Sequence, residues 1–559
     1  MAQVRVSEGV LEGTHEKNEY GGAFYSFKGV PYAQPPLGDL RFKAPQPPKP
    51  WTGVRSAKEF GSICYQMNPL TKSAWGSEDC LYVNIYSPDL KPKKPLPVML
   101  YIHGGSFSIG GSNDDMYGPE YLVRHDIILV TINYRLEVLG FLCLDSEDVP
   151  GNAGMKDQVQ ALRWVQKNIG AFGGDPDNVT IFGNSAGGVC VSFHLMSPMT
   201  KGLFRRAIMQ SGTSTCFWSM PFEHREVVLA LAKQLGCHST DNKILYEFFK
   251  AQPVDSLINL QIPTTMAIKA KNSSEIYFAI VSEKKFANTE RYFHGNSYDG
   301  IRGGIHEGIE VMNGYVEDEG IMTAIMTCRN DYATLMPRFN QFLEEYVPRP
   351  ITWHCSLVDQ FEVGRQIRDY YFKDNKMTFE VIDKLVKMYS MASVVYDVIQ
   401  WQKVCAGANS NKLYLYRFTC KSERNIMANV FGYWKIVGDK KTVCHVDDLA
   451  YLFPCKGRIK RTAPESKTFQ MIENVTKLWT NFAKFGDPTP IEEGVNWLPF
   501  TLEKQNYLDI GETLQPSINP ENDQLHFWEN LYKTYLHIYR YHLFQARKVF
   551  GSQVGIVLN

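Results

Sequence analysis

The chain has 559 residues, and its 59 Lys and Arg residues are balanced by 59 Asp and Glu residues, so the formal net charge is zero. This balance argues against a nucleic-acid-binding protein, which usually carries a basic patch, and against a polybasic membrane-surface protein. Hydrophobic residues make up 44% of the chain and aromatic residues 13%, which is typical of a globular protein with a large core and room for an apolar cleft. At about 100–200 residues per domain, length alone suggests three or four domains.

The first half of the chain predicts short strands, followed by strands that alternate with helices. Up to about residue 60 the sequence shows short β patterns separated by turns. Apolar residues at helical spacing from Met155 to Ile169 then predict a helix. Apolar and β-branched runs predict buried strands at 97–102, 127–133, 178–182 and 206–211.

The second half predicts mainly helices. The stretch 220–400 has mostly helical patterns, further strands are expected at 309–314 and 413–418, and the end from about Ser466 is expected to be helical, with an aromatic-rich last helix. Strands that alternate with helices indicate a mostly parallel sheet covered on both faces. The sequence therefore predicts an α/β fold.

The ends of the chain and its cysteines bear on its location and on metals. The N-terminal sequence MAQVRVSEGVLEG has no apolar run of signal-peptide length, and no run of about 18 apolar residues predicts a membrane span. The twelve cysteines are scattered without a CxxC pair, so no metal cluster is expected. We expect a cytoplasmic protein, although a secreted protein whose leader had been removed would show the same pattern.

Ser185 is a candidate nucleophile. It lies in the sequence Gly-Asn-Ser-Ala-Gly from Gly183 to Gly187, which fits G-x-S-x-G. In that pattern the serine occupies a tight strand-to-helix turn, and the glycines allow close approach of neighbouring backbone. The five-residue pattern alone could be a plain glycine-rich turn, but here a β-branched strand precedes it and a helical pattern follows, which favours the catalytic interpretation.

A second glycine-rich loop, from His103 to Ser106, follows the strand VMLYI. Such a loop lets backbone N–H groups face a tetrahedral intermediate, whereas on its own it could be an ordinary turn. Together with the serine motif it predicts an oxyanion hole made by the N–H groups of Gly105, Ser106 and Ala186. His103 is expected to shape the loop rather than to act in catalysis.

Two longer motifs resemble known signatures. The run FGGDPDNVTIFGNSAG from Phe172 to Gly187 resembles the serine signature of type-B carboxylesterases, and EDCLYVNIYSP from Glu78 to Pro88 resembles their second signature. The resemblance extends over nearly the whole chain and is most similar to the insect α-esterase group. It implies one α/β-hydrolase domain over residues 1–559, with a central mostly parallel sheet flanked by helices, a small N-terminal antiparallel sheet and helical insertions.

The resemblance also implies site residues. The acid of a Ser–Glu–His triad is then Glu319, in the sequence Asp-Glu-Gly, and the histidine is His445, which precedes a short acidic and aromatic segment. Ser211 matches a serine that supports the catalytic histidine. Cys64 and Cys80 match a disulfide of secreted members, although a reducing cytosol would leave them as thiols. The family needs no metal and no cofactor.

The chain departs from the family pattern in places that bear on specificity. Asn184 replaces a glutamate beside the nucleophile, and Ser106 replaces the third glycine of the oxyanion loop, so that its side chain would project towards the cleft. The region 260–300 matches the family poorly, so no substrate contacts are carried over to it.

These features together predict a carboxylic ester hydrolase. It would act through a serine acyl-enzyme on uncharged, apolar esters of dietary, lipid or xenobiotic origin, and organophosphates would phosphorylate it. Its partners would be small-molecule esters, with no nucleic acid and no membrane span, and it would be a monomer or a homodimer. The alternatives are a slow-turnover scavenger of the same family and a non-catalytic, adhesion-type relative.

Overall fold

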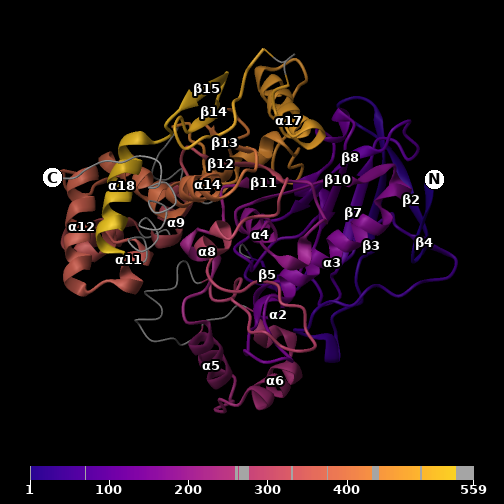
Figure 1. Cartoon of the computed structure of the whole chain (residues 1–559), viewed down its shortest axis with the longest axis horizontal. Helices are drawn as coiled ribbons and strands as arrows, with labels where there is room; N and C mark the ends of the chain where they lie inside the picture. The colour runs from indigo at the N-terminus through magenta and orange to yellow at the C-terminus, as the bar shows by residue number, and fades with distance from the viewer. Residues whose placement is uncertain are drawn as a thin grey trace, which may run out of the picture.

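The protein is built around one large sheet. The computed structural model describes residues 2–68, 71–258, 262, 276–328, 332–373, 375–430, 440–490 and 494–536. The strands follow the order β1-β2-β3-β7-β9-β8-β10-β11-β12-β13-β14-β15, with β4 paired to β2. All neighbours from β9 to β14 are parallel, whereas both ends of the sheet are antiparallel (Figure 1). The main strands are β7 (Tyr82–Ser87), β8 (Leu96–Ile102), β9 (Ile128–Ile132), β10 (Gly174–Asn184), β11 (Arg206–Gln210), β12 (Glu310–Val316) and β13 (Leu413–Phe418).

Successive side chains of the parallel strands enter two separate cores. On β8, Leu100 and Ile102 belong to one buried cluster, while Met99 and Tyr101 belong to the other. The first cluster includes side chains of α3 (Ala153–Asn168) and α4 (Ala186–His194), and the second includes side chains of α17 (Lys467–Phe485). This alternation is the period-two geometry of a strand, and it confirms the predicted sheet with helices on both faces.

The N-terminal strands are antiparallel, as predicted, and they join the main sheet. They are β1 (Ala2–Val6), β2 (Gly9–Lys17) and β3 (Ala23–Pro31), and β3 pairs with β7. The short β4 (Val54–Ser56) lies along β2. β5 (Gln66–Met67) and β6 (Ala74–Trp75) form a separate hairpin.

Most of the middle of the chain is helical, as the sequence predicts. In Figure 1, α5 and α6 form a protrusion at the bottom, and α11 and α12 lie at the left edge together with the C-terminal helix α18 (Asn522–Tyr535). The helices are α5 (His224–Gln234), α6 (Asn242–Ala251), α8 (Ser297–Arg302), α9 (Gly320–Cys328), α10 (Tyr332–Gln341), α11 (Arg349–His354), α12 (Leu357–Tyr371), α13 (Ile382–Ser390) and α14 (Tyr396–Ala408).

The helical prediction for the end of the chain is wrong in part. The expected helix is α17, but two strands follow it, β14 (Asn506–Ile510) and β15 (Leu514–Ile518). Both are five residues long, and β15 is an edge strand that contains Pro516, so neither gives a strong local pattern. The last described helix, α18 (Asn522–Tyr535), is aromatic-rich as predicted, and residues 537–559 lie outside the described residues.

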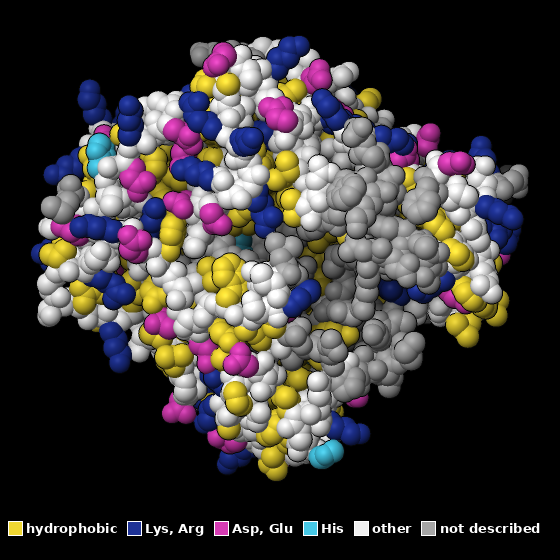
Figure 2. All heavy atoms as spheres, turned by 180° about the vertical axis from the view of Figure 1, so that it is seen from behind, with side chains coloured by type: hydrophobic (Ala, Val, Ile, Leu, Met, Phe, Trp, Pro, Cys, Tyr) yellow, Lys and Arg dark blue, Asp and Glu magenta, His cyan; other side chains and the backbone are white. Residues whose placement is uncertain are grey.

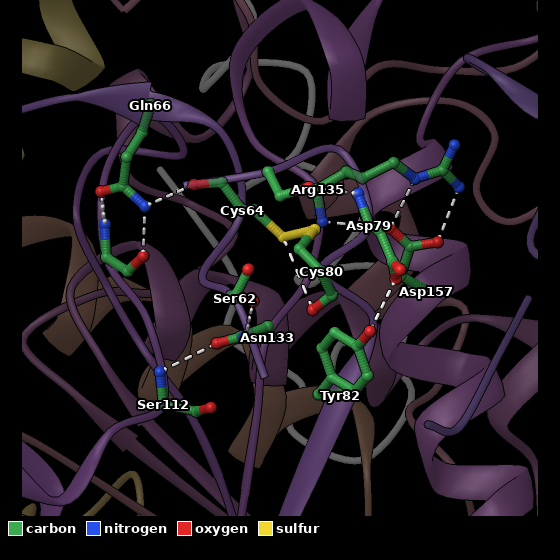
Figure 3. Close-up of a disulfide and its surroundings, with 12 residues drawn as sticks. Ser62, Cys64, Gln66, Asp79, Cys80, Tyr82, Ser112, Asn133, Arg135 and Asp157 are labelled. Atoms are coloured by element: carbon green, nitrogen blue, oxygen red, sulfur yellow. Dashed lines mark hydrogen bonds and ion pairs between the residues drawn. A yellow bond between two sulfur atoms is a disulfide. The ribbon is translucent and has the colours of Figure 1, made fainter. Parts of the chain in front are cut away.

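A disulfide between Cys64 and Cys80 anchors the loop beside the predicted oxyanion hole (Figure 3). Gln66 links this segment to that loop, because its side-chain amide donates to the carbonyls of Cys64 and Gly110 and accepts from the Gly110 N–H at 2.7 Å. Nearby, Arg135 and Asp157 form a fully buried ion pair at 2.6 Å. The Gln66 hydrogen bonds thus tie the chain just after the glycine-rich loop to the disulfide-bonded segment.

The surface carries no concentration of one charge on the face shown in Figure 2. Among the described residues of that face, Lys and Arg side chains are interspersed with Asp and Glu. None of the helices in the described ranges is both long and apolar enough to span a membrane.

Candidate active site

Ser185 occupies the turn between β10 and α4. Its backbone has φ 59° and ψ −126°, a conformation that is rare for a residue with a side chain. The glycines on either side are required by packing. A Cβ atom on Gly183 would lie 2.6 Å from the Gly187 carbonyl carbon, and one on Gly187 would lie 2.1 Å from the Ile102 oxygen. The Ser185 N–H donates to the Gln210 carbonyl at 2.8 Å, which fixes the turn against β11.

The glycine-rich loop after β8 lies directly against this turn. A Cβ on Gly104 would be 3.1 Å from the Ser185 Cβ. Gly105, Ser106 and Phe107 all have positive φ, at 113°, 54° and 59°. Only Gly105 adopts such a conformation at no cost. The loop therefore has a positive-φ backbone next to the candidate nucleophile. Its N–H groups were predicted to form part of an oxyanion hole at this place.

His103 shapes this loop, in agreement with the prediction. Its ring stacks on Tyr134 with centroids 4.5 Å apart, and its Nδ1 lies 2.8 Å from the Gly104 carbonyl oxygen. Burial lowers the pKa of His103 to about 4, so the imidazole is neutral at pH 7. Ala186 is the first residue of α4, and an N–H at that position has no partner within its own helix.

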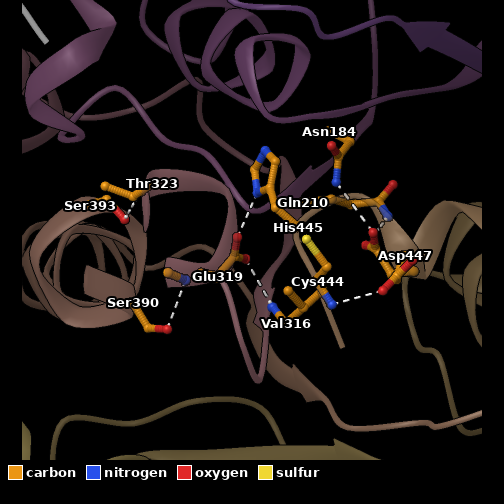
Figure 4. A network of polar contacts seen from close by, with 12 residues as sticks. Asn184, Gln210, Val316, Glu319, Thr323, Ser390, Ser393, Cys444, His445 and Asp447 are labelled. Atoms are coloured by element: carbon orange, nitrogen blue, oxygen red, sulfur yellow. Dashed lines mark hydrogen bonds and ion pairs between the residues drawn. The ribbon is translucent and has the colours of Figure 1, made fainter. Parts of the chain in front are cut away.

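Glu319 lies in the loop after β12, and His445 lies in the segment that follows β13. Their side chains face each other (Figure 4). Glu319 Oε2 lies 2.5 Å from His445 Nδ1, while its Oε1 accepts from the Val316 N–H at 3.0 Å. Both side chains are buried. Because Nδ1 faces the carboxylate, the proton is held on that nitrogen, and Nε2 on the other side of the ring can accept a proton.

Backbone contacts hold these two loops in register. The Asp318 N–H donates to the Val443 carbonyl at 3.0 Å, and the Val443 N–H donates back to Asp318 Oδ2 at 2.9 Å. The Gly320 N–H donates to Ser390 Oγ at 2.9 Å. The position of Glu319 is thus fixed from both sides by groups distant in sequence.

The electrostatic environment favours a charged imidazole at His445. Burial works against the imidazolium, but the Glu319 carboxylate and the more distant Asp448 and Asp447 outweigh it, and the pKa of His445 is raised above its ordinary value. The histidine can therefore accept a proton readily and is stabilised in the charged form that results.

A pocket brings these groups together. It encloses about 520 Å³ of space between atoms, part of it open to solvent. Among its lining residues in the described part of the chain, the titratable side chains are Glu319 and His445. The lining comprises Ser106, Ser185, Phe217, Trp218, Ile276, Glu319, Met322, Thr323, Ser393, Val394 and His445.

This geometry is accompanied by clear similarity to known proteins. A family model described as "Carboxylesterase family" matches residues 1–528. The chain belongs to the carboxylesterase family. Juvenile hormone esterase from Tribolium castaneum is 34% identical over 531 residues, which cover 90% of this carboxylesterase and 87% of that protein. Esterase FE4 from Myzus persicae is 33% identical over 514 residues, which cover 89% and 86%.

A solved structure extends the similarity to three dimensions. The crystal structure of juvenile hormone esterase from Manduca sexta, with OTFP covalently attached, matches this carboxylesterase with a TM-score of 0.82 and 28% sequence identity. The match covers 95% of this chain and 99% of that chain. The predicted family, the α/β-hydrolase fold and the activity of an ester hydrolase are thus confirmed.

The carboxylesterase also contains an acidic network that the sequence analysis did not assign. Asp448 Oδ2 accepts from Gln210 Nε2 at 2.7 Å, and its Oδ1 accepts from Asn184 Nδ2 at 3.3 Å. Burial raises the pKa of Asp448 to about 6 and that of Asp447 to about 8. The only sequence signal was the acidic pair after His445, and its hydrogen-bond partners come from distant strands.

Ser211 was predicted to support His445, and Cys444 directly precedes His445 in the chain. Ser211 has φ 53°, and its Oγ is buried with no hydrogen-bond partner among the described residues. Its predicted support of His445 therefore involves no direct hydrogen bond in this structure. Cys444, next to His445, is fully buried, and burial raises the pKa of its thiol well above the ordinary value, so it is unreactive as a nucleophile.

Proposed function

We propose that this carboxylesterase hydrolyses uncharged, apolar esters with Ser185 as nucleophile, His445 as general base and Glu319 as the group that orients the imidazole. The observation that supports this most directly is the pocket, where Ser185, Glu319 and His445 lie among apolar side chains. Within the described lining, no charged group other than the proposed catalytic pair is present to bind a charged substrate.

The proposed reaction has two halves. His445 Nε2 removes the proton of Ser185 Oγ as the oxygen attacks the ester carbonyl, and the N–H groups of Gly105, Ser106 and Ala186 stabilise the oxyanion. His445 then gives its proton to the alcohol oxygen, which leaves. Water attacks the acyl-enzyme by the same steps in reverse, which releases the acid and restores Ser185.

The apolar lining supports the proposed substrate class. Phe217, Trp218, Ile276, Met322 and Val394 offer apolar surface around the nucleophile, and apolar pockets with a few placed polar groups are typical of small-molecule sites. A charged acyl group would enter this pocket without a partner, which is costly. Xenobiotic and lipid esters fit these properties, and detoxification is a biological role consistent with them.

The test is a comparison of p-nitrophenyl esters. We expect neutral butyrate and hexanoate esters to exceed the hemisuccinate ester in kcat/KM by about 100-fold, because the extra carboxylate is buried unpaired. The Ser185→Ala variant should lose about 10⁶ in kcat. Equal rates with the charged ester would refute the substrate class, and an active Ser185→Ala variant would refute the nucleophile.

An organophosphate separates turnover from scavenging. In the proposed reaction Ser185 Oγ bonds to phosphorus and the leaving group departs, so mass spectrometry should find the phosphoryl adduct on the peptide that contains Ser185. An enzyme that turns over p-nitrophenyl esters continuously before inhibition is a hydrolase, whereas a single stoichiometric burst would support the scavenger alternative. Absence of both burst and turnover would support the non-catalytic, adhesion-type alternative.

The cellular location and the oligomeric state of the protein can be tested separately. Cytoplasmic location is the prediction from the sequence, while the Cys64–Cys80 disulfide favours its alternative, secretion, because disulfides persist in oxidising compartments. Quantifying free thiols in the purified native protein under denaturing conditions, with and without reductant, tests the bond. Sedimentation then distinguishes a monomer from a homodimer.

A further inference from the structure

Three side chains with metal-binding atoms converge away from the catalytic pocket. They are Cys143 and Asp145, in the segment after α2 (Glu137–Phe141), and His224, the first residue of α5. One ligand atom from each lies within 4.8 Å of the others. Cys143 Sγ is 3.7 Å from Asp145 Oδ1, and His224 Nε2 is 3.8 Å from Asp145 Oδ2.

The two separations that involve Asp145, one to each of its carboxylate oxygens, are close to those of a tetrahedral metal site, and the three donor atoms all lie within 4.8 Å of one another. Zinc binds thiolate sulfur at about 2.3 Å and imidazole nitrogen or carboxylate oxygen at about 2.0–2.2 Å, which places the ligand atoms roughly 3.3–3.8 Å apart. The three donors therefore lie close enough together to share one ion, and binding would draw them a few tenths of an ångström to about 1 Å closer.

The imidazole of His224 has a nitrogen available to bind an ion. Its Nε2 is buried and has no hydrogen-bond partner in the described part of the chain, although buried polar atoms are normally paired. It points into the cluster with Asp145 as its nearest charged neighbour. An imidazole nitrogen of this kind is the commonest metal ligand in proteins.

We propose that Cys143, Asp145 and His224 bind one divalent cation of the zinc class, with water in the fourth position. The donor set of one thiolate, one imidazole and one carboxylate is typical of Zn²⁺. On binding, the Cys143 thiol loses its proton to solvent, and the two negative ligands neutralise the ion. Asp145 and His224 are partly exposed, at 23% and 29%, so solvent can reach the site.

A neighbouring lysine side chain opposes binding of the ion at Asp145. Lys284 Nζ lies 3.5 Å from Asp145 Oδ2, and its side chain is 64% exposed. It competes for the carboxylate that the metal needs. Because it is mostly in solvent, it can move away at small cost, and its removal should strengthen binding of the metal by about 2–5-fold.

The position of the site indicates what binding would do. Cys143 and Asp145 follow α2, and His224 begins α5, a few residues after Phe217 and Trp218 of the substrate pocket. An ion would tie these two segments together. We expect it to raise the melting temperature by a few degrees, because a ligand of the native state stabilises that state, without acting on the ester itself.

The experiment uses the full-length protein without a histidine tag, dialysed against chelator. Titration with Zn²⁺ should show one site per chain in calorimetry, and Co²⁺ should give a thiolate-to-cobalt charge-transfer band. Asp145→Asn keeps a residue that tolerates the left-handed backbone at φ 53°. This variant, Cys143→Ser and His224→Asn should each weaken Zn²⁺ binding at this site by at least about 100-fold, and Lys284→Ala should strengthen it.

Cys237 and His238 provide matched controls, since they lie just after α5 and belong to no described cluster of metal-binding side chains. Cys237→Ser and His238→Asn should leave the affinity for Zn²⁺ and the cobalt band unchanged. All variants should keep the activity on p-nitrophenyl butyrate, which shows that they are folded. Failure of the native protein to bind Zn²⁺, or equal loss in the control variants, would overturn the proposal.

Discussion

The two halves of the candidate active site are held in different ways. Around Ser185 the fit is steric, because the glycines on either side of it leave no room for a Cβ and the backbone is held in rare conformations. Around Glu319 and His445 the fit is polar, since buried charges and N–H groups fix one another. Activity should therefore fall when atoms are added next to Ser185. Around Glu319 and His445 it should fall when a hydrogen-bond partner or a charge is removed.

Among the residues around the nucleophile, the largest effect is expected on the acid–base side. Glu319→Gln keeps the shape but removes the charge that holds the His445 tautomer, and kcat should fall by about 10⁴. The adjacent Asp318→Asn is the matched control, because Asp318 binds the Val443 N–H instead of the imidazole, and it should keep activity within about tenfold. Steady-state kinetics on one neutral ester measures both, and equal losses would contradict the assignment of the acid.

The second test concerns the steric side. Gly187→Ala places a methyl group 2.1 Å from the Ile102 oxygen, so the turn must shift. A displacement of about 1 Å can cost about 10² in rate, and overpacking costs about 1–3 kcal/mol of stability. Gly170→Ala is the control, since no atom lies within 4 Å of its added Cβ. Urea unfolding and kcat/KM should separate the two variants, and similar behaviour would show that the turn tolerates bulk.

The third test removes one charge from behind the histidine. The pKa of His445 is raised by the nearby carboxylates. Because the general base becomes active when it loses its proton as the pH rises, the acid limb of the kcat/KM profile should have its midpoint above pH 6.5. In Asp448→Asn one of those charges is absent, the pKa of His445 falls, and the limb should move to lower pH by less than about one unit. A limb that stays in place, or moves to higher pH, would exclude this influence of Asp448.

The smallest effect is expected at Ser106. Its side chain lines the pocket from a backbone with φ 54°. Ser106→Gly should raise kcat/KM for bulky acyl groups relative to acetyl by less than about tenfold, and change the rate of organophosphate inhibition. Ser106→Ala keeps the Cβ and distinguishes bulk from the hydroxyl group. Unchanged rates with short and long esters, and with the organophosphate, would show that Ser106 does not tune specificity.

Prediction from the sequence was strongest where structure is local. The turn at Ser185 and the buried strands β8 to β11 depend on short apolar runs and glycines, which are visible within a few residues. The strands β14 and β15 were missed because each is only five residues long and β15 is the edge strand of the sheet. Glu319 and His445 could be named only through the family resemblance, because nothing next to them in sequence distinguishes them from the other acids and histidines.

By itself the sequence determined the mostly parallel sheet, the serine turn and the glycine loop. The spacing of apolar residues, β-branched side chains and glycines each act on the backbone within a few residues, so their effect can be read locally. Only the tertiary structure decided how Asn184 and Gln210 reach Asp448, and how Cys143, Asp145 and His224 come within 4.8 Å of one another. The physical reason is that hydrogen bonds and metal ligands depend on distance in space, and folding brings together residues whose local sequences carry no sign of their partners.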